Sequence, residues 1–279
     1  MLKRIKSDDA FMGATHSISS IALYLLFLAL APQIFVKMFG TESILLILVS
    51  IFILYGASRL PDLDNTKSSA ISALGPFGEV LSEVMRSLSV MVFHISKTKY
   101  DGKDANPHRG FFHTAVSGIL LFFLVLSTTS IKGEIQGVPT SQIFAMIWVF
   151  ICSKIAFSAI LSKTLKKYKK KSKLLAGGIN TILSFFISIL IIILTRNSTP
   201  NYQWLAFVIA FGYISHIIGD TMTVSGAPIL FPIPIKGKRW FNVRIARFEA
   251  GGEIEKIILI PTFLIISILS MIRIFTYIT

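Results

Sequence analysis

The sequence contains little of what a soluble or a secreted protein needs. Of its 279 residues only 15% are charged, whereas 53% are hydrophobic and the mean hydropathy is +0.71. This composition lies outside the range of soluble globular domains. The single cysteine, Cys152, excludes a disulfide framework, and its apolar surroundings in the sequence make inert packing its expected role.

Acidic residues are also scarce: 14 Asp and Glu face 28 Lys and Arg, which gives a formal net charge of +14. A positive charge of this size could indicate a nucleic-acid-binding protein. The basic residues, however, lie in loops beside apolar segments, where they set membrane topology and attract anionic lipid head groups. We therefore expect no nucleic-acid partner.

Long apolar runs make up most of the chain. A run of about 18 or more apolar residues predicts a transmembrane helix, because lipid cannot hydrogen-bond to exposed backbone groups. We predict an all-α polytopic membrane protein whose residues 1–279 form a single membrane-embedded domain with about seven transmembrane helices. The predicted spans are 17–39, 43–60, 113–131, 141–162, 174–195, 203–220 and 256–277.

The segment 66–100 has a different pattern, since apolar residues recur at helical spacing among Glu79, Glu83 and Arg86. The pattern predicts an amphipathic helix, which either lies in the membrane interface or packs over the bundle. Its apolar positions are Leu74, Phe77, Val80, Leu81, Val84, Met85 and Leu88.

The distribution of basic residues predicts the orientation. With the N-terminus inside, the inner segments 1–16, 59–112, 163–173 and 221–256 hold 23 of the 28 Lys and Arg residues. This is a strong positive-inside signal. We predict a multi-pass protein of the cell membrane with a cytoplasmic N-terminus.

Histidines and acidic residues gather in five short clusters, each at a span end that this topology places in the cytoplasm. The charge count did not use these clusters, so the agreement indicates that they meet in one place. They are Thr15-His16, Leu60-Pro61-Asp62-Leu63-Asp64-Asn65, Pro107-His108-Arg109-Gly110-Phe111-Phe112-His113-Thr114, Gly212-Tyr213-Ile214-Ser215-His216-Ile217-Ile218-Gly219-Asp220, and Gly251-Gly252-Glu253-Ile254-Glu255.

The spacing within the clusters suits metal ligands. His216 and Asp220 are one helical turn apart, so their side chains leave the same face. Pro61 favours an extended segment, in which both carboxylates of 62–64 would lie on one side. Asn106-Pro107 predicts a helix start, which puts the histidines of 108–113 on different stripes. Those two histidines would then face different ions, or one would bind an ion while the other orients a ligand.

Ionisable residues at membrane depth are costly and are functional by default. The clusters offer four His, three Asp and one Glu, enough for two divalent ions. Mixed imidazole and carboxylate ligands favour Zn²⁺, with Mn²⁺ or Fe²⁺ as alternatives, and the lack of Cys ligands disfavours a closed structural zinc site. The candidate ligands are His16, Asp62, Asp64, His108, His113, His216, Asp220 and a glutamate of the last cluster.

Two further polar residues have open roles. Arg109 either forms an ion pair with an Asp or binds a substrate oxyanion, for which its planar guanidinium is suited. Thr221 and Thr223 follow Asp220 directly and could orient ligands. His94 lies outside every cluster, and we expect it to be structural.

Together the five clusters resemble the YdjM-type family of predicted membrane-bound metal-dependent hydrolases, described in bacteria as LexA-regulated. The family pattern selects Glu255 over Glu253. Asn65 and Phe112 depart from it, since a His often stands at the first position and a Thr or Ser at the second. The family is distantly similar to the zinc-dependent phospholipase C and single-strand nuclease group, which implies phosphoester hydrolysis. The pattern falls on His16, Asp62, Asp64, His108, Arg109, His113, His216, Asp220, Thr223 and Glu255.

The resemblance therefore implies a metal-dependent hydrolase that cleaves a phosphoester of a lipid or lipid-linked substrate at the cytoplasmic interface. Asp62 or Asp64 would orient or deprotonate water, while Arg109 and Thr223 would contact the substrate. The alternative is a divalent-metal transporter or channel, because intramembrane His and Asp also mark ion pathways. The outer halves of the spans carry almost no polar residues of this kind, which disfavours transport. An intramembrane metalloprotease is disfavoured because the sequence contains no His-Glu-x-x-His.

Overall fold

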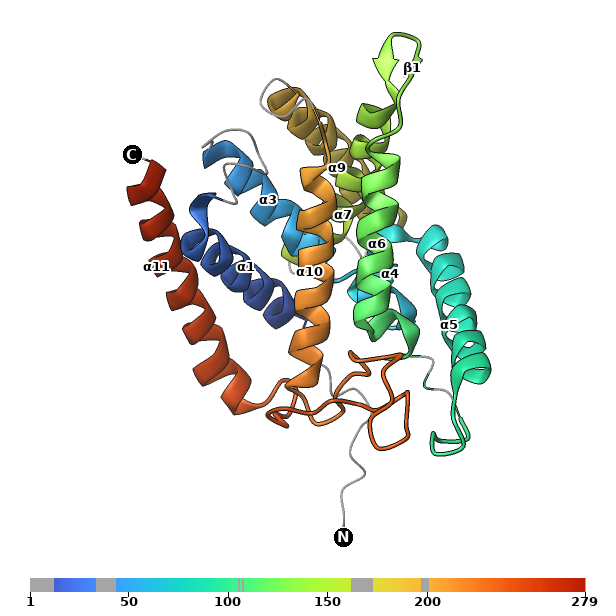
Figure 1. Ribbon diagram of the computed structural model, residues 1–279. Coiled ribbons are helices and arrows are strands. Elements are labelled where there is room, and N and C mark those ends of the chain that lie inside the picture. Colours follow the sequence, from blue (N-terminus) through green and yellow to red (C-terminus); the bar gives the residue numbers. More distant parts are fainter. Residues whose placement is uncertain are drawn as a thin grey trace.

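The computed structural model describes residues 13–33, 44–104, 106, 108–161, 173–196 and 201–278. Within these ranges most of the chain is helical, as Figure 1 shows. Six stretches are long and apolar enough, by length and composition, to cross a membrane. They confirm the prediction of an all-α polytopic membrane protein.

The helices coincide closely with the predicted spans. The long ones are α1 (Gly13–Leu30), α3 (Ile44–Ala57), α7 (Thr140–Ile160), α9 (Lys173–Thr195), α10 (Trp204–Thr221) and α11 (Ile260–Ile278). In the predicted span 113–131 lies α6 (Ala115–Thr128), an apolar helix of 14 residues. At about 21 Å it is shorter than a typical spanning helix of roughly 20 residues. Residues 34–39 of the first predicted span lie outside the described residues.

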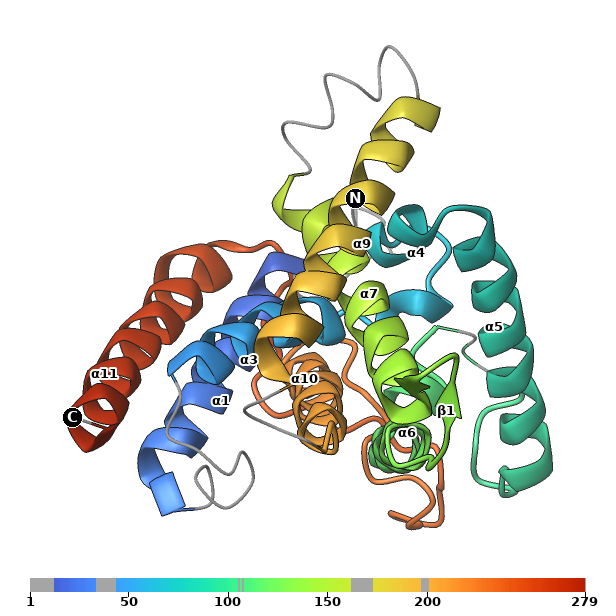
Figure 2. The same cartoon turned by 90° about the horizontal axis from the view of Figure 1, so that it is seen from above.

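Helix α10 forms the centre of the bundle. It packs against α1, α3 and α6 and is buried over most of its length. Helix α7 lies between α3 and α9, and α11 packs along α1. Seen from above, α11 and α5 (Pro76–Ser96) lie at opposite edges of the molecule (Figure 2). A helix in the position of α10 must be apolar on nearly every face, and a polar side chain on it faces another helix rather than lipid.

The predicted amphipathic helix over 66–100 is wrong as a single element. It forms two helices, α4 (Ser69–Leu74) and α5, because Gly75 adopts a positive φ of 63° and Pro76 starts the second helix. Of the two placements left open for this segment, α5 packs against the bundle, next to the turns 61–64 and 111–113.

The face that α5 turns toward the bundle differs from the predicted apolar stripe. Gly78, Ser82 and Ser89 are buried together with Met85 and Phe93, whereas most of the large apolar side chains point outward. Close packing through small residues is typical of helices whose outer surface contacts lipid, since lipid offers no hydrophobic reason to bury large side chains. The exposed stripe is Phe77, Val80, Val84, Leu88, Met91 and Ile95.

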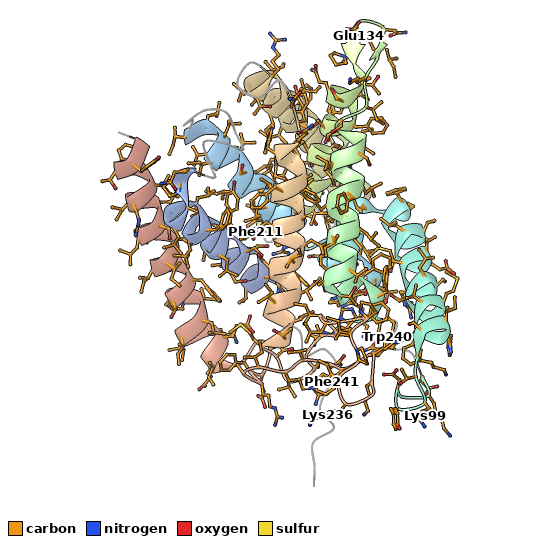
Figure 3. All side chains as sticks on the ribbon, viewed as in Figure 1. Lys99, Glu134, Phe211, Lys236, Trp240 and Phe241 are labelled. Atoms are coloured by element: carbon orange, nitrogen blue, oxygen red, sulfur yellow. The ribbon has the colours of Figure 1, made fainter. Side chains whose placement is uncertain are left out.

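The two ends of the bundle are built differently. At one end β1 (Glu134–Ile135) and β2 (Val138–Pro139) form a hairpin whose turn residues Gln136 and Gly137 both have positive φ, as tight hairpins require. At the other end, residues 222–254, which we call the cap segment, fold beneath α6 and α10. Figure 3 shows Glu134 at the hairpin end and Lys99, Lys236 and Trp240 at the cap end.

Asp101 ties the cap segment to the residues that follow α5. Its carboxylate accepts backbone N–H bonds from Thr98 (2.7 Å), Trp240 (3.0 Å) and Arg239 (3.3 Å). Burial acts to raise the pKa of Asp101, but these donors outweigh it and hold the pKa below its ordinary value. The ring of Trp240 also packs against that of Phe93 on α5, with centroids 5.5 Å apart, so the contact has an apolar part.

Candidate metal centre

Four elements bring the sequence clusters together at the cap end of the bundle. They are the first turns of α1, the 3₁₀ turn η1 (Pro61–Asp64), the 3₁₀ turn η2 (Phe111–His113) and the last turns of α10. Two groups of three residues form there, and within each group the ligand atoms all lie within 4.8 Å of one another. The first group is His16, His216 and Asp220, and the second is Asp62, His108 and His113.

The first group joins α1 to α10. His216 Nε2 lies 3.6 Å from Asp220 Oδ2, as their one-turn spacing predicts. The other oxygen of the same carboxylate, Oδ1, lies 3.5 Å from His16 Nε2. All three side chains are fully buried. One carboxylate therefore presents a separate oxygen to each imidazole.

The second group depends on the turn η1. The prediction of an extended segment at 61–64 is wrong, because Leu60 is helical (φ −62°, ψ −38°) and Pro61 occupies the first helical position. Residues two apart on a 3₁₀ turn point in different directions. Asp62 consequently approaches His216, with Oδ1 3.6 Å from Nε2, whereas Asp64 approaches the histidines of 108–113.

The predicted helix start at Asn106-Pro107 is also wrong. Helix α6 begins at Ala115, where the hydroxyl of Thr114 accepts the N–H of Ser117 as an N-cap. The preceding residues are irregular, and Pro107 lies outside the described residues. Freed from a common helix, His108 and His113 approach each other with ring centroids 5.2 Å apart and belong to one group.

Asp64 lies behind the histidines of the second group. Its Oδ1 is 2.8 Å from Nδ1 of His108 and its Oδ2 is 3.2 Å from Nδ1 of His113. The carboxylate is only 1% exposed, whereas the side chain of Asp62 is 15% exposed. A carboxylate on one ring nitrogen fixes the tautomer and leaves the other nitrogen for an ion. This placement suits Asp64 to orienting His108 and His113.

A backbone carbonyl plays the same part for His216. Its Nδ1 lies 2.7 Å from the carbonyl oxygen of Ser58, which leaves Nε2 directed at the carboxylates. The contact requires α10 to approach α3 closely. Gly212 permits this, because a Cβ there would meet Ala57 Cβ and Ser58 N at 3.1 Å.

The two groups adjoin. His113 Nε2 lies 3.3 Å from Asp220 Oδ2, and His216 Nε2 lies 3.6 Å from Asp62 Oδ1. The rings of His113 and His216 have centroids 5.5 Å apart. A centre that shares Asp220 between two neighbouring ions is therefore compatible with these positions.

The residues fit a divalent cation on a second ground. Within the described chain, His113 Nε2, His216 Nε2 and Asp220 Oδ2 are buried atoms that make no hydrogen bond. Buried polar atoms are almost always hydrogen-bonded, and unpaired ones are costly. Imidazole nitrogens and carboxylate oxygens that converge without hydrogens between them form the donor set of a metal site.

Arg109 lies at the edge of the first group. Its guanidinium donates to Asp220 Oδ1 at 3.0 Å, to the Thr223 hydroxyl at 3.1 Å and to the Gly226 carbonyl at 3.1 Å. The residue has a positive φ of 61°, a conformation that non-glycine residues rarely adopt and that is often found at functional sites. Thr223 also donates to the Asp220 carbonyl at 2.8 Å. Of the two roles left open for Arg109, the ion pair with an Asp is present.

A small cavity of about 140 Å³ lies between Arg109 and the cap segment. Asn106 and Asn242 line it with amide groups, while Phe93 and Trp240 supply aromatic walls. Arg109 therefore contacts both the carboxylate of the first group and a partly polar space outside it.

Glu255 is fully buried but stands outside both groups. Its carboxylate accepts a hydrogen bond from the Thr15 hydroxyl and one from the backbone N–H of Gly251 at 2.6 Å. It begins a π-helical turn, Glu255–Leu259, that leads into α11. The structure thus places Glu255 next to Thr15 at the start of α1, and Thr15 directly precedes His16 in the sequence.

Sequence reasoning did not select Thr15, Ser58 or Tyr213 as site residues. The Tyr213 hydroxyl donates to the Phe112 carbonyl at 2.6 Å and so holds the turn that carries His113. Thr15 and Tyr213 stood inside the clusters as neighbours of histidines, which was the available signal. Ser58 acts through its carbonyl, and no residue type reveals that role.

Residues 181–277, about a third of the chain, match the model of a protein family described as YdjM inner membrane protein. The match contains His216, Asp220, Thr223 and Glu255, but not the ligands contributed by α1, η1 and η2. No curated protein and no solved structure matches the chain. The protein is thus a polytopic membrane protein whose last third is similar to that inner-membrane family.

Proposed function

We propose that this protein is a metal-dependent hydrolase that cleaves a phosphoester of a lipid or lipid-linked substrate at the cytoplasmic face of the membrane. The observation that supports it most directly is the pair of adjoining His and Asp groups, with buried ring nitrogens that make no hydrogen bond within the described chain. The family match to an inner membrane protein and the basic loops at the cap end agree with the proposed location.

Two divalent ions, Zn²⁺ in the first instance and Mn²⁺ or Fe²⁺ as alternatives, would be held by His16, His216 and Asp220 and by Asp62, His108 and His113. When bound, such cations supply Lewis acidity toward a phosphoryl oxygen and lower the pKa of water. Glu255 supports the first group from α11 through Thr15.

The two aspartates of η1 take different roles in this proposal. Asp64 is engaged by two histidines and orients them. Asp62 is the more exposed carboxylate and carries no comparable pair of contacts, so it is the group that accepts a proton from the attacking water. Of the two bases that the sequence left open, the geometry favours Asp62.

Arg109 supplies the positive charge that a phosphate in the adjoining cavity would meet. Asp220, Thr223 and Gly226 already hold its guanidinium in place. Binding of a substrate therefore requires no further loss of conformational entropy from this side chain. Thr223 contributes by fixing that guanidinium.

The proposal is tested with the full chain purified in detergent and stripped of metal by a chelator. Hydrolysis of fluorogenic phosphoesters and of phospholipids should vanish and return on addition of Zn²⁺ or Mn²⁺. Asp62→Asn should reduce the turnover rate by about 100-fold or more, in the range typical of general bases. Glu83→Gln, on the exposed face of α5, is the matched control and should leave the rate unchanged.

Proteoliposomes separate hydrolysis from metal transport. The same preparation, loaded with a metal-sensitive dye, should show no uptake of Zn²⁺ or Mn²⁺ beyond that of empty vesicles. Metal uptake without phosphoester hydrolysis would show that the protein is a transporter and not a hydrolase. Hydrolysis that persists in the stripped protein and in Asp62→Asn would refute the proposed site.

A further inference from the structure

A groove of about 530 Å³ lies between α1, α6 and α10. Its walls are almost wholly apolar and rich in aromatic rings: Leu23, Phe27, Phe122, Phe207, Phe211 and Ile214. Figure 3 places Phe211 between α1 and α10, and its ring lies 6.0 Å from that of Phe27. The groove therefore occupies the membrane-spanning part of the bundle rather than the cap end.

At one end the groove reaches the level of the metal centre along the bundle. On α1, residues 16, 20, 23 and 27 share one helical face, so His16 continues the stripe of Leu23 about 10 Å further on. On α10, Ser215 and Ile218 line the groove at the level of His216 and Asp220, which lie on another face of that helix. On α6, Gly118 lines it, and this helix follows directly on the turn that carries His113.

The dimensions of the groove suit a lipid acyl chain better than a helix. The groove extends along α10 from Phe207 to Ile218, which is roughly 16 Å of helix axis. A volume of about 530 Å³ over that length gives a cross-section of roughly 30 Å². A helix is about 10 Å across and has a cross-section of nearly 80 Å², so it is too wide to lie inside the groove.

We propose that the groove holds an acyl chain of an anionic membrane phospholipid, with the head group directed at the metal centre. This inference rests on the proposed function for the fate of the head group, but not for the binding of the chain. Rim residues Ile119 and Phe123 are 50% and 57% exposed, so the groove opens sideways into the bilayer and a lipid can enter laterally.

Charge at the cap end selects the head group. Lys99 and Lys236 lie there, as Figure 3 shows, and Lys97, Lys238 and Arg239 are their neighbours in the contact between α5 and the cap segment. Clustered basic residues at a membrane surface attract anionic lipids. An anionic phospholipid therefore satisfies both the apolar groove and the basic surface.

The experiment uses the full chain in nanodiscs with a phospholipid that carries a photoreactive diazirine in its acyl chain, as phosphatidylglycerol or as phosphatidylcholine. Cross-linked peptides are mapped by mass spectrometry. Ala210, buried at the groove wall, is changed to Phe to fill it, and Leu190→Phe on the exposed face of α9 is the matched control. Ile119→Trp, at the exposed rim, narrows the entrance without adding bulk to the core.

The wild type and Leu190→Phe should be labelled on α1, α6 and α10, more strongly by phosphatidylglycerol than by phosphatidylcholine. In Ala210→Phe and Ile119→Trp this labelling should be at least fivefold weaker, while the content of bound metal stays the same. Labelling that is as dense on α9 and α11 as in the groove would overturn the inference. Labelling that is unchanged in both Ala210→Phe and Ile119→Trp would overturn it as well. A labelled groove in a protein that hydrolyses no phosphoester supports the lipid site and refutes the proposed enzyme, whereas hydrolysis with an unlabelled groove does the reverse.

Discussion

The imidazole of His16 stacks on that of His216, with ring centroids 3.7 Å apart and planes inclined by 22°. This contact joins the start of α1 to the end of α10, and both rings face the same carboxylate, Asp220. Two neutral rings can lie this close, whereas two imidazolium ions in a buried site would repel each other strongly. The arrangement is therefore compatible with neutral rings, whose nitrogens could bind a cation.

The first prediction concerns the bound metal. The His216 side chain belongs to the first group and also approaches Asp62 of the second group. His216→Ala removes it. Elemental analysis of the purified protein should find at least one equivalent fewer of bound Zn or Mn. His94→Ala, an exposed histidine outside both groups, should retain the full content. Unchanged metal in His216→Ala would show that the groups do not bind the ion.

The second prediction separates the two aspartates of η1. Asp64→Asn should weaken metal affinity by about 10- to 100-fold, since carboxylates that orient ligating histidines typically have effects of this size. The measurement is competition with a chromophoric chelator. Asp62→Asn should reduce turnover more than Asp64→Asn at saturating metal. The assigned roles would be reversed if Asp64→Asn bound metal normally and was inactive.

The third prediction tests the close approach of α10 and α3. A Leu at position 212 must push against Ala57 and Ser58, so Gly212→Leu should lower the free energy of unfolding by about 1–3 kcal/mol. It should also weaken metal binding, because the carbonyl of Ser58 can no longer reach His216. Thermal unfolding in detergent measures the first effect and chelator competition the second.

Gly177 provides the control for that change. It lies on α9, and a Cβ there would meet nothing within 4 Å. Gly177→Leu should therefore leave metal binding unchanged and stabilise the helix slightly, because Leu has the higher helix propensity. Equal effects of the two substitutions would mean that the α3–α10 contact is unimportant.

The fourth prediction concerns pH and the cap segment. The pKa of Asp101 is lower in the folded protein than its ordinary value, so its contribution to stability is complete above that ordinary value, about 3.9. The contribution is lost as the pH falls from there through the lower, folded pKa. The protection factors of the Arg239 and Trp240 amides, measured by hydrogen exchange and corrected for the intrinsic pH dependence of exchange, should fall below about pH 4.

Asp101→Asn should show low protection factors already at neutral pH, since an amide accepts weaker hydrogen bonds than a carboxylate. Asp104→Asn, an exposed neighbour, should behave like the wild type. Wild-type protection factors that do not change with pH would exclude Asp101 as the anchor of the cap segment.

Apolar runs alone determined that this is a polytopic helical membrane protein, because the bilayer permits no other use of such sequence. They also located most of the helices to within a few residues, although α1 ends at Leu30 and the predicted span runs to residue 39. The one-turn spacing of His216 and Asp220 on α10 likewise follows from helix geometry and needs no tertiary information.

Local preferences failed where tertiary contacts outweigh them. Pro61 suggested an extended segment and Asn106-Pro107 a helix start, yet the first is a 3₁₀ turn and the helix begins only after Thr114. Most of the predicted apolar stripe of α5 faces outward, because lipid offers no hydrophobic reason to bury large apolar side chains.

The sequence by itself determined the class of protein, its helices and the residue types of the candidate centre. Only the tertiary structure decided that Asp64 lies behind two histidines, that Arg109 pairs with Asp220, and that Ser58 positions His216. The physical reason is that helix and membrane signals are local and repeat along the chain. The role of a ligand depends instead on which atoms of distant segments meet, and no local pattern encodes that meeting.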